Sequence, residues 1–272
     1  MPLNNCPIGV FDSGVGGLTI VKALAEEMPG EDMIYVGDTA HVPYGDKNFE
    51  QLLSYGVRII DFLLEQNVKM IIAACGTHSS TTLPLLTKKC PVPLLGVVKP
   101  GVKGTIRTTR NRRIAVMATA VTTKSGAYGK EITKVFPDAR VWEIACPKLV
   151  PLIEAGITDG PAVEDPVREY LDEPLSEGID TVVLGCTHYP YLMHVISRIT
   201  GDLVEIVDPA RETIVEVKSL LAEGSGFNSG NQGNTRYFAT GSADSFFSSG
   251  KMLIGTELTK VETINLESKY GG

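Results

Sequence analysis

Short apolar runs alternate with amphipathic segments along this chain. The runs at 8–11, 33–36, 71–74 and 181–184 hold no charged residue, which is typical of strands buried on both faces. Between them, apolar residues recur three and four positions apart, most clearly over 48–66, and this spacing predicts helices. Strands that alternate with helices predict an α/β fold, with a mainly parallel sheet covered by helices on both faces.

The same pattern gives a set of expected elements. We expect strands over residues 8–11, 33–36, 71–75, 93–98, 114–117, 141–145, 181–186, 203–207, 236–240 and 261–266. We expect helices over 18–28, 48–66, 81–89, 124–136, 161–175, 191–199, 209–222 and 244–253, and a basic helix after residue 100. The stretch 224–234 is rich in Gly and Asn, with Phe227 as its one large apolar residue, and predicts a flexible loop.

Two of the expected strands run into a cysteine. Cys75 is followed by Gly-Thr-His, and Cys186 is followed by Thr-His. The two cysteines lie 111 residues apart, so the second can occupy the equivalent position in a second half of the molecule. Because ligands bind at the carboxyl ends of parallel strands, we expect both cysteines to face one cleft and to act on one small molecule.

The residues around these cysteines suit proton transfer. A cysteine between a strand and a helix meets the positive end of the helix dipole, which favours the thiolate. A single free cysteine is more often a small core residue, but two at matched strand ends favour the chemical role. His188 could hold or supply the proton of Cys186. His78 is three residues from Cys75, and a position facing the helix is the alternative for it.

Asp12 and the glycines after it allow several interpretations. Asp12 ends the first strand and could be an orienting base, a partner for an ammonium group or the N-cap of the next helix. The sequence Gly14-Val-Gly-Gly is a weak dinucleotide-binding signal, because Thr19 stands where a third glycine belongs. A loop whose N–H groups bind a substrate carboxylate explains the glycines equally well. Glu154 could be a surface helix acid or a catalytic one.

Composition narrows the choice of partners and compartment. The 272 residues fit one large or two modest domains, and the net charge of −7 argues against binding of nucleic acid through overall basicity. No apolar stretch reaches the roughly 20 residues of a membrane helix, and no secretory signal is expected at the N-terminus. Five widely spaced cysteines without a C-x-x-C pair disfavour disulfides and structural zinc, and indicate a reducing cytoplasm.

Taken together, the motifs resemble the glutamate racemases of the cofactor-independent aspartate/glutamate racemase family. The matching stretches are 8–19, 35–39, 43–47, Ala74-Cys75 with Thr77, Thr119 with Thr122, Ser125 and Tyr128, 146–154, 184–190 and 238–241. The resemblance covers nearly the whole chain. Two positions depart from it: Gly76 stands where the family usually has Asn, and His78 where it usually has a small apolar residue.

The resemblance implies a fold of two pseudo-symmetric, doubly wound halves with helices on both faces of each sheet. It implies a first domain of residues 1–98 plus 208–272 that carries Cys75, and a second of residues 99–207 that carries Cys186. The active site is expected between the two halves.

The resemblance also implies interconversion of L- and D-glutamate without cofactor or metal. Cys75 is expected to serve D-glutamate and Cys186 L-glutamate, supported by Asp12, His188 and Glu154. The implied substrate contacts are Asp12, Ser13, Pro43, Tyr44, Gly45, Gly76, Thr77, Thr119, Thr122, Thr187 and His188. A homodimer is expected, with the product supplying peptidoglycan synthesis. The alternatives are a racemase for aspartate or another acid, a nucleotide-binding or dithiol redox protein, and a non-catalytic binding module for acidic amino acids.

Overall fold

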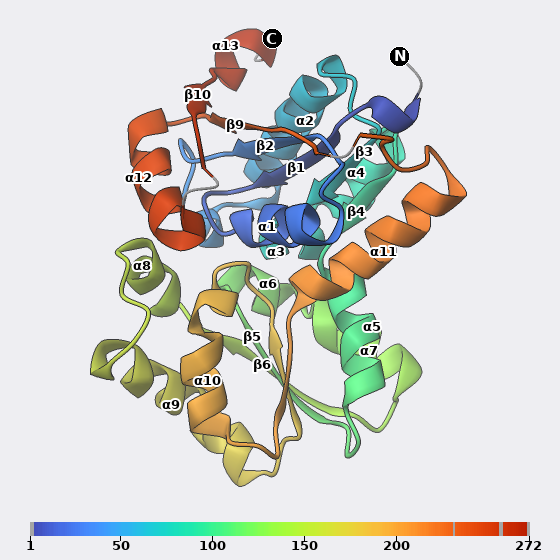
Figure 1. The fold of residues 1–272 in the computed structure, drawn as a ribbon. Helices are drawn as coiled ribbons and strands as arrows, with labels where there is room; N and C mark the ends of the chain where they lie inside the picture. Colours follow the sequence, from blue (N-terminus) through green and yellow to red (C-terminus); the bar gives the residue numbers. More distant parts are fainter. Residues whose placement is uncertain (1–2, 231, 256–257, 271–272) are drawn as a thin grey trace.

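The computed structural model describes residues 3–230, 232–255 and 258–270, which form two parallel sheets (Figure 1). The first sheet has the order β10-β9-β2-β1-β3-β4 and the second the order β6-β5-β7-β8. In the first, the strands are β1 (Ile8–Asp12), β2 (Met33–Gly37), β3 (Met70–Ala73), β4 (Leu94–Gly96), β9 (Thr235–Ala239) and β10 (Val261–Thr263). In the second, they are β5 (Arg113–Ala118), β6 (Arg140–Ala145), β7 (Thr181–Leu184) and β8 (Glu205–Val207). We call the parts around these sheets the first and the second half.

Helices cover both faces of each sheet, as predicted. On the first sheet, one face carries α1 (Leu18–Glu27), α11 (Pro209–Glu223) and α12 (Ala243–Ile254), and the other carries α2 (Phe49–Glu65), α4 (Leu83–Lys89) and α13 (Leu266–Tyr270). On the second sheet, one face carries α8 (Leu149–Glu154), α9 (Pro161–Ser176) and α10 (Met193–Thr200), and the other carries α5 (Val98–Thr108) and α7 (Ala127–Val135).

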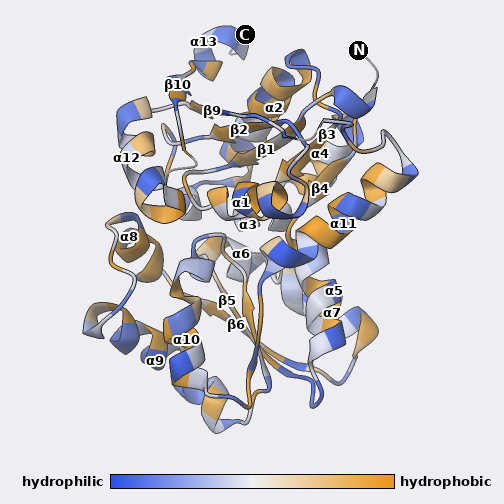
Figure 2. Ribbon diagram, in the orientation of Figure 1, coloured by the Kyte–Doolittle hydropathy of each residue, from blue (hydrophilic) through white to orange (hydrophobic). Residues whose placement is uncertain are grey.

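Burial on both faces explains why the strands are apolar throughout. In β1, Val10 packs toward α1 and α11, and Phe11 packs toward α2. Figure 2 shows the strands mainly in the hydrophobic colour, whereas helices such as α9 and α11 mix it with hydrophilic residues. Each fully buried large apolar side chain stabilises the fold by about 1.5–3 kcal/mol, so the apolar runs that predicted the strands also supply the core.

The two halves share one strand order. The series β2-β1-β3-β4 in the first sheet corresponds to β6-β5-β7-β8 in the second, which confirms the predicted pseudo-symmetry. In each half, the second strand pairs on one side of the first strand and the third strand pairs on its other side. The strand order therefore reverses between β1 and β3 in the first half, and between β5 and β7 in the second. Ligands bind at the carboxyl ends of strands at such a switch. Cys75 and Cys186 follow β3 and β7, two strands in equivalent positions.

The chain crosses between the halves twice, through α5 and α11, which pack against each other. Gly101 and Gly104 of α5 allow close contact with Pro209 and Glu212 of α11. Lys103 pairs with Glu216 at 2.5 Å, and Arg107 pairs with Glu212 at 2.6 Å. Part of the basic segment near residue 100 is therefore an ion-paired helix face.

The division of the chain into domains at 98/99 and 207/208 stays a prediction. Two features support it: α5 begins at Val98 and packs on the second sheet, and α11 begins at Pro209 and packs on the first.

Some predicted elements differ from the structure. The helix expected from Thr81 is preceded by a short helix, α3 (Gly76–Ser80), which starts directly after Cys75. The expected last strand stops at Thr263, and α13 follows it. Asn265 accepts a hydrogen bond from the Ser268 backbone N–H at 2.9 Å, a helix-start signal that the pattern of apolar residues does not contain.

The sequence predicts a flexible loop over 224–234, but hydrogen bonds attach this loop to the first half. Residue 231 of the loop lies outside the described residues. The Lys69 ammonium and the Glu31 carboxylate, both buried, lie 2.6 Å apart. Lys69 also donates to the Gly226 carbonyl at 3.2 Å, and Glu31 accepts from the Asn228 backbone N–H at 2.7 Å. The loop backbone thus completes the hydrogen bonding of a buried ion pair, and these contacts hold residues 226 and 228 against the first half.

Candidate active site

A cavity of ≈ 70 Å³ lies between the halves, at the carboxyl ends of the central strands. It is lined by Asp12, Ser13, Val42, Pro43, Tyr44, Gly45, Cys75, Gly76, Thr77, Thr119, Val150, Glu154, Gly185, Cys186, Thr187 and His188. All the site residues named from the sequence line it except Thr122. The structure thus brings residues from both halves to one place.

Thr122 lies behind the cavity wall. It is on α6 (Ala120–Ser125), is fully buried, and accepts a hydrogen bond from Thr119 at 3.1 Å and one from Ser80 at 3.4 Å. Three lining residues were not predicted: Val42, Val150 and Gly185. Apolar side chains and a glycine carry no chemical signal in a sequence, so only the fold reveals them.

Cys75 sits at the start of α3 and is buried. Its Sγ lies 3.9 Å from the Ser13 Oγ. Burial and the nearby Asp12 carboxylate raise the pKa of the Cys75 thiol well above its usual range, although the backbone N–H groups of His78 and Thr77 act in the opposite direction. The helix start therefore does not by itself make Cys75 a thiolate, contrary to the simple dipole argument.

Cys186 has a different environment. Its Sγ lies 3.7 Å from Nδ1 of the buried His188, and Nε2 of His188 lies 3.1 Å from Oε1 of Glu154. Burial lowers the pKa of His188, but Cys186 and Glu154 outweigh it and raise the pKa to about 10. His188 is therefore a cation near neutral pH, and its ring lies directly beside the Cys186 sulfur.

Asp12 joins the two halves at the base of the cavity. Its carboxylate accepts hydrogen bonds from the backbone N–H groups of Ser13 and Gly17, and from the hydroxyl of Thr187 at 3.1 Å. Helix α1 has Gly17, not Asp12, at its N-cap. The N–H groups of Ser13 and Gly17 thus bind Asp12 of the same chain, and a role of the other loop N–H groups as a receptor for a substrate carboxylate stays a prediction.

Two glycines allow the halves to approach each other at the cavity. A Cβ on Gly16 would lie 2.4 Å from Nδ1 of His188, and one on Gly76 would lie 2.6 Å from the Gly185 carbonyl oxygen. Both distances are too short for real side chains. Between the halves, the hydroxyls of Thr77 and Thr119 are 3.2 Å apart. The cavity is thus closed by contacts that need small residues at 16 and 76.

Two thiols from opposite halves, with a histidine cation beside one and a carboxylate near the other, can take a proton from a bound molecule and return one to it. Within residues 3–230, 232–255 and 258–270, no group of three or more His, Cys, Asp or Glu side chains is arranged to hold a metal ion. No helix in the same part of the chain has both the length and the apolarity to cross a bilayer.

Comparison with known proteins agrees with this arrangement. Residues 15–217 match the profile described as Asp/Glu/Hydantoin racemase. The chain belongs to the Asp/Glu/Hydantoin racemase family. Within the family it is similar to the glutamate racemase of Desulforudis audaxviator, with 44% identity over 95% of this chain and 97% of the relative.

Solved structures of the family have the same fold. The glutamate racemase isoform RacE1 of Bacillus anthracis superposes with a TM-score of 0.92 and 32% identity, covering 96% of this chain and 98% of that one. The glutamate racemase of Francisella tularensis, crystallised in complex with D-glutamate, gives a TM-score of 0.91 and 36% identity, covering 98% and 100%.

The two departures from the usual racemase family pattern, Gly76 and His78, lie together on α3. His78 is fully buried, with Nδ1 2.7 Å from the Thr82 hydroxyl and its ring edge-on to Phe11 and Tyr44. With no carboxylate bound to it, burial lowers the pKa of His78 to about 4, so the ring is neutral. His78 is a packing residue beneath Tyr44 and does not line the cavity.

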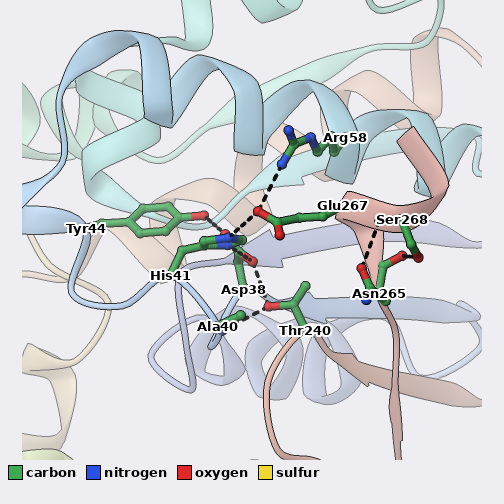
Figure 3. A network of polar contacts seen from close by, with 9 residues as sticks. All are labelled: Asp38, Ala40, His41, Tyr44, Arg58, Thr240, Asn265, Glu267 and Ser268. Atoms are coloured by element: carbon green, nitrogen blue, oxygen red, sulfur yellow. Dashed lines mark hydrogen bonds and ion pairs between the residues drawn. The ribbon is translucent and has the colours of Figure 1, made fainter. Parts of the chain in front are cut away.

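Asp38 is a residue whose role the sequence did not reveal. It follows β2, is buried, and accepts a hydrogen bond from the Tyr44 hydroxyl at 2.5 Å (Figure 3). Tyr44 and Thr240, which also binds Asp38, come from segments 6 and 202 residues away along the chain. The one available signal was a carboxylate at the end of a strand, a position it shares with Asp12.

Proposed function

We propose that this protein interconverts L- and D-glutamate by a two-base mechanism that uses Cys75 and Cys186. The observation that carries the proposal is the presence of both thiols in one cavity, each following the equivalent strand of its half. Two acid–base groups on opposite faces of one carbon can invert it without moving the substrate, whereas a lone base returns the proton to the face it came from. The similarity to glutamate racemases over nearly the whole chain supports glutamate as the substrate.

The two cysteine environments suit opposite roles at the start of the reaction. Cys186, beside the His188 cation, would act as thiolate and take the Cα proton of L-glutamate. Cys75, whose pKa is raised by burial and by Asp12, would act as thiol and deliver its proton to the other face. The bond from Cα to its old hydrogen breaks, the one to the new hydrogen forms, and the two sulfurs exchange charge. The D-to-L direction runs in reverse.

Substrate charge would help to activate Cys75. Asp12 raises the pKa of the Cys75 thiol through its negative charge. The ammonium group of an amino acid bound beside Asp12 would offset this charge and make a Cys75 thiolate easier to form. Hydrogen bonds from the hydroxyls of Ser13 and Thr77 would stabilise the negative charge that gathers on the substrate carboxylate.

A racemase for aspartate or another acidic amino acid is the second candidate, and Gly76 is the observation that favours testing it. The family usually carries Asn at this position, whose side-chain amide would contact the substrate. Gly76 has no side chain and lacks this contact. The loss of this contact near Cys75 would change which length of acidic side chain the cavity accepts.

We further propose that the protein works in the cytoplasm, forms a two-fold homodimer and supplies D-glutamate for peptidoglycan. Cys75, Cys90, Cys146 and Cys186 are free thiols, which suits a reducing compartment. Two-fold dimers are the commonest soluble oligomers, and size-exclusion chromatography with light scattering tests this part directly.

The decisive experiment measures deuterium uptake at Cα of each glutamate enantiomer in D₂O, together with the change in circular dichroism. We expect the wild-type protein to exchange and to invert both enantiomers. Cys75→Ala should lose inversion by on the order of 100- to 10,000-fold, while Cys186 continues to exchange the Cα proton of L-glutamate. Cys90→Ala, which replaces a thiol outside the cavity, serves as the matched control.

Other results would point elsewhere. Normal inversion by Cys75→Ala would exclude the two-thiol mechanism. Binding of glutamate without any exchange would indicate a binding module, and a reversible disulfide between the two cysteines in the working form would indicate a redox protein. A panel of acidic amino acids in the same assay distinguishes glutamate from aspartate.

A further inference from the structure

One wall of the cavity is the loop 38–45, which joins β2 to the short turn η2 (Tyr44–Asp46). Four of its residues, 42–45, line the cavity. On the side away from the cavity, His41 of the loop makes a polar contact with the C-terminal helix α13 (Figure 3). A helix from the far end of the chain is thereby connected to the wall of the site.

The inner end of this connection is fixed by Asp38. The buried carboxylate accepts hydrogen bonds from Tyr44 at 2.5 Å and from Thr240 at 2.7 Å, and lies 2.8 Å from Nδ1 of His41. Burial acts to raise the pKa of Asp38, but hydrogen bonds from His41, Tyr44 and Thr240 outweigh it and lower the pKa. Asp38 is therefore a charged anchor for the loop near neutral pH.

The outer end reaches α13. Nε2 of His41 lies 3.3 Å from Oε1 of Glu267, which also lies 3.4 Å from the Arg58 guanidinium of α2. The His41 ring stacks on Tyr55 at 3.9 Å between ring centres. Tyr55 in turn lies 6.0 Å from the ring of Tyr44. The His41 imidazole thus links the loop to α13, and it contacts Tyr55, whose ring packs near Tyr44 in the cavity wall.

We propose that Glu267, acting through His41, is a positioning residue that holds the loop 38–45 against the cavity and so strengthens substrate binding. The proposal rests on the function proposed above only in taking this cavity as the substrate site. Asp38 fixes the base of the loop, and the Glu267 contact restrains the imidazole from the opposite side. Glu267 does not touch the cavity, so its effect must pass through the loop.

The charge on His41 gives the contact a dependence on pH. The hydrogen bond to Asp38 raises the pKa of His41, with Glu267 adding to the effect and burial opposing it. The groups that face His41 are Asp38 at the end of β2, Glu267 of α13, and Arg58 and Tyr55 of α2. Because the folded pKa is raised, the contribution is full below about pH 6.5 and is lost as the pH rises through the folded pKa.

The test compares Glu267→Ala with Lys269→Ala in the full-length protein. Lys269 forms an ion pair with Glu65 and ties α13 to α2 without touching the loop. An exposed pair typically shifts an equilibrium by about two- to five-fold at most. We therefore expect Glu267→Ala to raise KM for both enantiomers by about two- to five-fold with kcat unchanged, and Lys269→Ala to leave both constants as they are.

Two further readouts separate this role from a general loosening of α13. The ratio of KM between Glu267→Ala and wild type should be largest at about pH 6 and should fall as the pH rises, because neutral His41 no longer pairs with the carboxylate. In a His41→Asn background, Glu267→Ala should add nothing to KM. The ratio cancels any titration of the substrate itself, since both proteins bind the same molecule.

An unchanged KM in Glu267→Ala, an equal rise in Lys269→Ala, or a full effect without His41 would each overturn the proposal. These outcomes are distinct from failure of the proposed function. If the wild-type protein inverted aspartate instead of glutamate, the same KM comparison would be made with aspartate, and a protein that only bound its ligand would be tested by its dissociation constant.

Discussion

The two histidines behind the two cysteines show how one strand-end motif becomes two different acid–base sites. His78 and His188 both follow a cysteine within three residues, and both are buried. His78 binds only the hydroxyl of Thr82, and burial lowers its pKa to about 4. His188 binds Cys186 and Glu154, and its pKa is raised to about 10. The two buried imidazoles therefore differ in charge, because Cys186 and Glu154 raise the pKa of His188.

The difference has a consequence for catalysis. On the Cys186 side, a histidine cation lies next to the sulfur. On the Cys75 side, the neighbouring histidine faces Tyr44 and Phe11, and the carboxylate of Asp12 acts on the thiol instead. A pseudo-symmetric fold therefore presents an asymmetric pair of thiols, which is what a reaction that takes a proton on one side and gives one on the other requires.

The largest effect on kcat/KM is expected from substituting each of the two histidines in turn. His188→Asn should lower kcat/KM by on the order of 100-fold, whereas His78→Phe, which keeps a ring between Tyr44 and Phe11, should stay within about a few-fold of wild type. The two enantiomers have equal free energy, so His188→Asn must lower kcat/KM equally in both directions. Deuterium uptake should show the side: exchange of L-glutamate slows more than exchange of D-glutamate. Equal losses in both variants would contradict the comparison.

A smaller effect is expected from the glycine that follows Cys75. In Gly76→Ala the added Cβ would meet the Gly185 carbonyl at 2.6 Å, so the halves must separate slightly. Overpacking of this kind typically costs about 1–3 kcal/mol, and we expect kcat/KM to fall by about ten-fold or more. Steady-state kinetics measures the loss. Gly230→Ala is the control, because its Cβ would make only ordinary contacts at 3.5 Å. A similar loss of kcat/KM in Gly230→Ala would contradict a specific role of residue 76.

The smallest kinetic effect is expected from Glu154→Gln. The substitution removes a carboxylate that raises the pKa of His188, so that pKa should fall from about 10. Because Cys186 still raises the pKa of His188, activity near pH 7 should change by only about two-fold. NMR titration of the imidazole signals measures both histidines in one sample, with His78 titrating near pH 4. A neutral His188 at pH 7 in the wild-type protein would contradict our description of the Cys186 side.

Much of this site could be read from the sequence because its residues follow apolar strands. Asp12, Cys75, Thr119 and Cys186 stand at the ends of strands that the apolar runs predict, and a doubly wound sheet brings such ends together. Thr122, which the resemblance implied as a substrate contact, is not among the residues that line the cavity. It is one helical turn beyond Thr119, and its hydroxyl binds Thr119 and Ser80 instead.

Contacts between distant segments could not be read in this way. The support of Tyr44 by Asp38 and Thr240, and the contact of His41 with Glu267, join residues up to 226 positions apart. Nothing in the local pattern around 267 indicates a partner at 41. The different charge states of His78 and His188 were equally hidden, because the pKa of His188 depends in part on Glu154, which lies 34 residues before it.

The parallel pairing of β9 with β2 also determines the order in which the molecule can be completed during synthesis. The second sheet is built from residues 113–207, one continuous stretch that can assemble as soon as it has left the ribosome. The first sheet must wait for residues 235–263, and until they arrive β2 has an unpaired, apolar edge open to other chains. The nascent protein therefore keeps this edge open from the synthesis of β2 until residues 235–239 have emerged, and a chaperone that shields the edge would act in that interval.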